Sequence, residues 1–254
     1  MVEDVVQRCK ASHGVFVAIE GASGVGITTL LSMISKEVAK QANVVSTYEP
    51  HFPSIATWLR EGHSPTATAL AMLADRIDHL SKVVYPAIAD NAVVMCGRYD
   101  VSTWVYNVLV GGMSTVFEQV VADVSAVLPV PDLYIQLDAP AEVLRGRIKA
   151  RAAEESKSPS QWILQDGFLE KLVAGYRAWF DRMPESQSVL KLNTNVAYSE
   201  MWGLAEVAAS RVLEIRGERM RAKFSQPVKH VGGDNGKACN SRSGSSAEGG
   251  AEGS

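Results

Sequence analysis

The chain has 254 residues, of which 46% are hydrophobic and 21% are charged, a composition typical of a globular protein. Its formal net charge of -3 offers no basic field for nucleic acid, and no apolar run approaches the roughly 20 residues that span a membrane. Cys9, Cys96 and Cys239 lie far apart and give no zinc-binding spacing. The acidic N-terminus is unlike a secretory signal or a mitochondrial transit peptide. We therefore expect a cytoplasmic protein that binds neither nucleic acid nor a membrane.

Strands and helices alternate along the chain. Short apolar, β-branched runs predict five buried strands, at 15–19, 43–47, 92–96, 132–138 and 188–193. Apolar residues at helical spacing predict helices at 28–42, 66–91 with a bend at Pro86, 101–110, 115–128, 140–155, 165–182 and 199–220. This alternation predicts an α/β fold, with a five-stranded parallel sheet, helices on both faces and ligands at the carboxyl ends of the strands.

The composition changes near both ends of the chain. We expect an N-terminal extension over residues 1–13 and one α/β domain over 14–222. Residues 223–254 turn into glycine, serine and isolated charges, which cannot bury enough apolar surface to offset the entropy lost on ordering. We predict that this segment is a disordered tail.

The stretch IEGASGVGITTL, residues 19–30, nearly matches the phosphate-binding loop G-x-x-x-x-G-K-[ST]. Ile27 stands where the lysine is expected. Backbone amides and a helix N-terminus can hold a phosphate without that lysine, and the hydroxyl of Thr28 could bind Mg²⁺. Losing the ammonium group should cost roughly 2–4 kcal/mol in the transition state unless another cation replaces it. The alternative is that the glycines only form a tight turn. The predicted ATP-binding residues are Gly21, Ala22, Ser23, Gly24, Val25, Gly26, Ile27, Thr28 and Thr29.

Residues 73–107, LADRIDHLSKVVYPAIADNAVVMCGRYDVSTWVYN, resemble the thymidylate kinase family. Members of that family carry a similar A-D-R helix, then a buried strand ending in D-R-Y, a serine pair and an aromatic–polar pair. The resemblance extends through PDLYIQLDAPAEVLRGRI and covers roughly residues 14–215. It implies a P-loop NTPase fold with a lid at about 150–165. It also implies an enzyme, usually a homodimer, that uses ATP and Mg²⁺ to phosphorylate a nucleoside monophosphate, here deoxythymidine monophosphate (dTMP).

The resemblance also implies roles for individual side chains. Arg76 and Arg98 match the two arginines that hold the acceptor phosphate, a task suited to a guanidinium because it binds phosphate bidentately. Arg147 and Arg151 lead into the lid, where with Arg98 they could carry catalysis. The predicted monophosphate-binding set is Glu49, Met72, Arg76, Arg98, Tyr106 and Asn107. The alternatives are a solvated Arg76, ordinary helix packing of Tyr106 and Asn107, and a basic surface helix in place of the lid.

The departures from the family pattern lie at positions that take part in catalysis or substrate binding in the family. Ile27 replaces the loop lysine, Gly97 replaces the aspartate of D-R-Y, and Tyr48 stands where many members have an arginine. Ser23 replaces a carboxylate, and Met72 replaces a phenylalanine that stacks on thymine. Three functions are therefore considered: a divergent thymidylate kinase, a weak or inactive nucleotide-binding relative with a structural or regulatory role, and a kinase for another nucleoside monophosphate.

Overall fold

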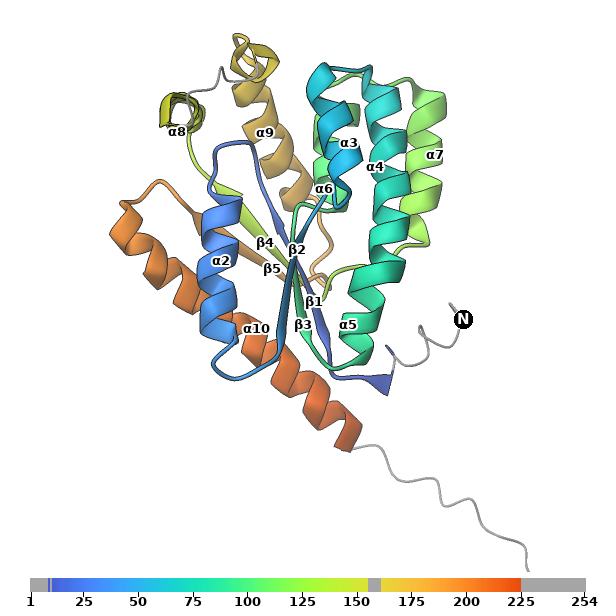
Figure 1. Cartoon of the computed structure of the whole chain (residues 1–254), viewed down its shortest axis with the longest axis vertical. Helices are drawn as coiled ribbons and strands as arrows, with labels where there is room; N and C mark the ends of the chain where they lie inside the picture. Colours follow the sequence, from blue (N-terminus) through green and yellow to red (C-terminus); the bar gives the residue numbers. More distant parts are fainter. Residues whose placement is uncertain (1–8, 10, 155–160, 225–254) are drawn as a thin grey trace, which may run out of the picture.

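The computed structural model describes residues 9, 11–154 and 161–224. Its five strands form one parallel sheet with the order β2-β3-β1-β4-β5 (Figure 1). The strands are β1 (Val15–Glu20), β2 (Val44–Tyr48), β3 (Val93–Gly97), β4 (Leu133–Asp138) and β5 (Val189–Asn193). The predicted α/β fold with a five-stranded parallel sheet is confirmed. Every residue of β1 and β3 is buried, as expected for central strands covered on both faces.

Helices cover both faces of the sheet (Figure 1). α2 and α10 pack on each other and on one face, while α5 and α9 contact β3 and β4 on the other. The helices are α2 (Ile27–Val38), α3 (Pro53–Trp58), α4 (Pro65–His79), α5 (Tyr85–Ala89), α6 (Asp100–Thr103), α7 (Thr115–Ala126), α8 (Ala141–Glu154), α9 (Phe168–Asp181) and α10 (Met201–Phe224). No helix in the described ranges is long and apolar enough to cross a membrane.

Some helical segments differ from the sequence prediction. The expected helix 66–91 is α4 and α5 joined by a π-helical turn, Leu80–Val84, because Pro86 near the start of α5 cannot donate a backbone hydrogen bond to that turn. A second π-helical segment, Trp104–Leu109, follows α6. The short helix α3 has too few residues for a periodic signal.

Two predicted regions lie largely outside the described residues. Residues 155–160 of the expected lid are among them, whereas α8 and the 3₁₀ turn Gln161–Leu164 flank this gap. The expected tail begins within α10, which ends at Phe224, and its remainder falls beyond the described chain.

Strand register determines which residues meet at the carboxyl edge of the sheet. Gly97 at the end of β3 pairs with Ile19 of β1 on one side and with Tyr48 of β2 on the other. Residues separated by tens of positions in the sequence therefore lie in one row, directly beside the glycine loop that follows β1.

Candidate phosphate-binding site

The glycine loop joins β1 to α2 in a conformation that only glycine adopts easily. Gly24 and Gly26 have φ angles of 85° and 102°. A side chain at Gly24 would also place its Cβ 2.9 Å from the carbonyl oxygen of Leu144. Gly26 is the N-cap of α2, and no side chain caps the helix there. The first amides of α2 are thus open to a ligand, and the helix N-terminus adds partial positive charge.

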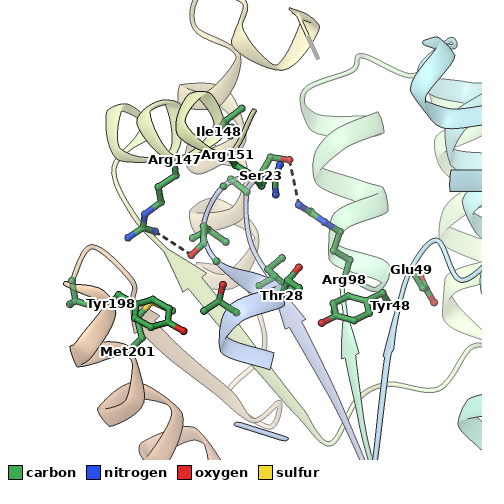
Figure 2. Close-up of a pocket in the computed structure, with 18 residues that line it drawn as sticks. Ser23, Thr28, Tyr48, Glu49, Arg98, Arg147, Ile148, Arg151, Tyr198 and Met201 are labelled. Atoms are coloured by element: carbon green, nitrogen blue, oxygen red, sulfur yellow. Dashed lines mark hydrogen bonds between the residues drawn. The ribbon is translucent and has the colours of Figure 1, made fainter. Parts of the chain in front are cut away.

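A pocket of about 530 Å³ lies above this loop (Figure 2). It is bounded by the ends of β2 and β3, by α8 and by the segment that follows β5. All nine predicted ATP-binding residues except Gly21 line it. The other lining residues are Tyr48, Glu49, Gly97, Arg98, Arg147, Ile148, Arg151, Val196, Tyr198 and Met201. Three arginines and one acidic residue give the pocket a positive balance, which suits an anionic ligand.

Arg98 reaches from the end of β3 to the glycine loop (Figure 2). Its Nη1 donates to the carbonyl oxygen of Gly21 at 3.1 Å and to the hydroxyls of Ser102 and Tyr176 at 3.2 Å. Its Nη2 lies 3.4 Å from Ser23 Oγ. Burial opposes its charge, but the neighbouring tyrosines and Glu20 raise the pKa of Arg98 overall, so it remains a cation at all relevant pH values.

The backbone of Arg98 is also unusual. Its φ angle is 69°, in the left-handed region that residues with side chains seldom adopt. Its backbone amide donates to the Ile19 carbonyl oxygen at 2.9 Å, which fixes this conformation. A strained residue held over a ligand pocket is a frequent feature of functional sites.

A buried network beneath Arg98 was not predicted from the sequence. Glu20, at the end of β1, accepts hydrogen bonds from the amide of Tyr99 at 2.7 Å and the hydroxyl of Ser102 at 2.6 Å. Ser102 in turn lies 2.8 Å from the Tyr176 hydroxyl. Burial raises the pKa of Glu20 to about 7. The sequence offered one signal for this network, the charged Glu20 at the end of an otherwise apolar strand. The GY pair at 175–176 was a weaker signal.

The two predicted catalytic arginines of α8, Arg147 and Arg151, differ in what they contact. Arg147 donates to the carbonyl oxygen of Thr194 at 2.6 Å and approaches that of Val25 at 3.5 Å, so it fastens the loop to the segment after β5. Arg151, one helical turn further along α8, is exposed at the pocket and has no partner within the described part of the chain. Of these two arginines, Arg151 is therefore the one whose charge is available to a ligand.

The predicted monophosphate-binding residues divide into two groups. Tyr106 is tied to the loop, because its hydroxyl lies 2.8 Å from Ser23 Oγ and accepts from the Ser23 amide at 3.1 Å. Arg76 is instead fully buried, away from the pocket lining, and its guanidinium bonds one oxygen of Glu49 at 2.7 and 2.8 Å and the Thr103 hydroxyl at 2.9 Å.

Two further predicted residues, Met72 and Asn107, are buried and do not line the pocket either. The structure therefore brings together the glycine loop, Arg98 and Tyr106. Arg76, Met72 and Asn107 are buried and do not line the pocket.

Three of the residues that depart from the family pattern meet around position 97. Tyr48 and Gly97 are register partners, and a Cβ at position 97 would lie 2.5 Å from the Tyr48 ring and 3.1 Å from Ile27. The Tyr48 ring extends toward Thr28 (Figure 2). Burial raises the pKa of Tyr48 above its usual value, against an opposing hydrogen bond with the Thr28 side chain. Ile27, Tyr48 and Gly97 are called the aromatic patch below.

The residues around Thr28 do not fit the Mg²⁺ that the resemblance implies. Mg²⁺ at a phosphate site is usually held by one or two protein carboxylates together with waters and the phosphates of the substrate. Glu49 is the one carboxylate among the described residues that line the pocket, and its side chain is 0% exposed. Both of its oxygens are engaged, one by Arg76 and the other by His79 at 3.3 Å.

The sheet order and the glycine loop between β1 and α2 define a P-loop nucleotide-binding protein. The sequence model of the family described as thymidylate kinase matches residues 19–195, and the chain belongs to this family. Membership supports a nucleoside-monophosphate kinase, and the family generally uses ATP with Mg²⁺.

Similar proteins come from several bacteria. A thymidylate kinase of Staphylococcus haemolyticus is 31% identical over 187 residues, which cover 71% of this chain and 91% of that protein. A thymidylate kinase of Synechococcus sp. is 33% identical over 202 residues, which cover 75% and 94%. A putative thymidylate kinase of Treponema pallidum is 28% identical over 216 residues, which cover 82% and 97%.

Proposed function

We propose that this chain binds ATP on its glycine loop and a nucleoside monophosphate, dTMP, beside Arg98, and that it phosphorylates dTMP slowly. One observation carries the proposal: a single pocket joins the open N-terminus of α2 to the guanidinium of Arg98. A phosphate donor and a phosphate acceptor could therefore meet there. Family membership supplies the substrate pair.

The residues would divide the task by position. The amides at the start of α2 and the guanidinium of Arg151 would hold the donor phosphates, while Arg98 would hold the acceptor phosphate. A phosphate oxygen of the acceptor would attack the γ-phosphorus of ATP, and ADP would leave. Phosphoryl transfer depends mainly on positioning and charge, so a site that lacks the loop lysine can still act, but we expect a low rate.

A second function is favoured by the aromatic patch. Ile27, Tyr48 and Gly97 replace three polar or charged groups, and the side chains of Ile27 and Tyr48 both border the space beside Gly97. A pocket that keeps its phosphate loop while its reacting end is apolar could bind nucleotide without turnover. The chain would then have a structural or regulatory role.

A coupled ADP-release assay with ATP and a panel of nucleoside monophosphates separates the two functions. We expect release with dTMP, at a rate at least ~100-fold below the 1–100 s⁻¹ typical of kinases. The matched control is the Arg98→Ala variant, which should lose this release. Saturable binding of both nucleotides without release would support the second function. Failure to bind either nucleotide would sink both.

We also propose that the chain forms a homodimer through α4 and α7, which pack together. Apolar side chains on the outer surfaces of these helices are exposed, including Ile77 at 51%, Val116 at 70% and Val120 at 41%. Exposed apolar side chains gathered on two neighbouring helices are typical of a surface that a partner covers. Sedimentation should show a dimer, and Ile77→Glu with Val116→Glu should give a folded monomer. A wild-type monomer at micromolar concentration would rule this out.

A further inference from the structure

We propose that Tyr48 stands in the place a metal ion would need, and that the pocket consequently takes its polyphosphate ligand without Mg²⁺. Tyr48 would thus be the residue that sets the metal dependence of this site. The inference rests on the proposed nucleotide binding and concerns the form of the ligand that the loop selects.

The Tyr48 ring occupies the space beside Gly97, since a Cβ at that position would come within 2.5 Å of the ring. With the ring in this place, a carboxylate at the end of β3 has no room, and any side chain at position 97 would require the ring to move. The same ring extends toward Thr28, whose hydroxyl was the predicted metal ligand (Figure 2).

The charges that line the pocket also favour an anion over a cation. Arg98, Arg147 and Arg151 line the pocket, and Glu49, the only acidic side chain lining it among the described residues, is already paired with Arg76. Together with the N-terminus of α2, these groups attract negative charge and repel a divalent cation. Free ADP is more negative than its Mg²⁺ complex, so the metal-free anion gains more from this field.

Ile27 also borders the space beside Gly97, because its Cγ2 would lie 3.1 Å from a Cβ placed at that position. A side chain at position 97 would therefore meet both the Tyr48 ring and the apolar Ile27 side chain. Positions 27, 48 and 97 are coupled through this shared space.

The test is calorimetric titration of the full chain with ADP, in EDTA and in millimolar Mg²⁺. We expect ADP to bind at least as tightly in EDTA as in Mg²⁺. Tighter binding by roughly tenfold in Mg²⁺ would overturn the inference and leave the proposed nucleotide binding intact. Failure of ADP to bind in either buffer would overturn the nucleotide binding as well, so the two failures are distinguishable.

Variants assign the effect to Tyr48. Tyr48→Ser with Gly97→Asp removes the ring and adds a carboxylate in the space it leaves. This double variant should bind ADP roughly tenfold more tightly in Mg²⁺ than in EDTA, because it restores a metal ligand beside Thr28. The matched control is Tyr48→Phe, which keeps the ring and should stay indifferent to Mg²⁺. A folded double variant that is equally indifferent, with folding checked by thermal unfolding, would overturn the role of Tyr48.

Discussion

The glycine loop and the ends of β2 and β3 face each other across one pocket, yet they differ in what they keep of the family pattern. On the loop side, Gly24 and Gly26 hold left-handed conformations and α2 begins without a side-chain cap. On the strand side, Tyr48 packs over Gly97 where charged groups are expected. Binding a phosphate needs only backbone amides and a helix end, whereas transferring one needs charges at defined places. The loop side of this pocket therefore keeps the backbone features that suit phosphate binding, while the strand side lacks the charges expected for transfer.

The largest effect should come from converting the rebuilt side to the family pattern. Ile27→Lys, Tyr48→Arg and Gly97→Asp together should raise turnover about 10²- to 10³-fold, because an ammonium group in a desolvated site is worth roughly 2–4 kcal/mol in the transition state. Ile27→Lys alone should change little, since position 97 would still be a glycine without a carboxylate and the Tyr48 ring would still occupy the space beside it. Steady-state kinetics with ATP and dTMP measure both.

Non-additivity is the decisive feature of that series. When groups act as a unit, restoring them together raises turnover far more than the sum of the single changes. If Ile27→Lys by itself gave the full increase, the three positions would be independent and the aromatic patch would not be a unit. A wild-type rate of about 1 s⁻¹ or more would contradict the proposed slow transfer.

The glycine-loop side of the pocket can be probed through Glu20, which ends β1. Its pKa of about 7 lies above its usual value of 4.5, so the folded state binds the proton more tightly. Its stabilising contribution is therefore complete below pH 4.5 and is lost as the pH rises through 7. Glu20→Gln, which resembles the protonated side chain, should remove a decline of up to about 3 kcal/mol in the free energy of unfolding.

Urea denaturation between about pH 4.5 and 8 measures this decline for both proteins. Because other buried carboxyls also titrate, the quantity to compare is the difference between wild type and variant. Glu185→Gln, at an exposed glutamate, is the matched control and should leave the pH profile unchanged. Parallel profiles for wild type and Glu20→Gln would show that Glu20 titrates as it does in the unfolded chain.

The sequence predicted the strands and the loop because both depend on local patterns. β1 and its glycine loop follow from a short apolar run and glycine spacing. The contact between Tyr48 and Gly97 depends on strand order and register, which no local pattern encodes. For the same reason the burial of Arg76 against Glu49, and the network from Glu20 to Tyr176, appear only when distant elements are placed together.

Arg98 connects the two sides, so its removal should affect one ligand more than the other. Arg98→Ala should weaken dTMP binding by roughly 2 kcal/mol, about 30-fold, because a charge-assisted contact is lost. Binding of ADP should change little. Calorimetry with each nucleotide measures this, and Arg98→Lys is a control that keeps the charge but not the guanidinium geometry. Equal losses for both ligands would mean that Arg98 mainly supports the loop through Gly21.

The smallest effects should distinguish the two arginines of α8. Arg151→Ala removes an exposed cation with no partner in the described chain, so ADP binding should weaken by about 1 kcal/mol, roughly fivefold, with an unchanged Tm. Arg147→Ala instead takes a donor from the Thr194 carbonyl oxygen and should lower the free energy of unfolding by about 1 kcal/mol. Thermal unfolding and ADP titration on the same two variants separate binding from stability. If Arg151→Ala lowered Tm while Arg147→Ala did not, the assignment of Arg147 as the fastening residue and Arg151 as the ligand-facing cation would be reversed.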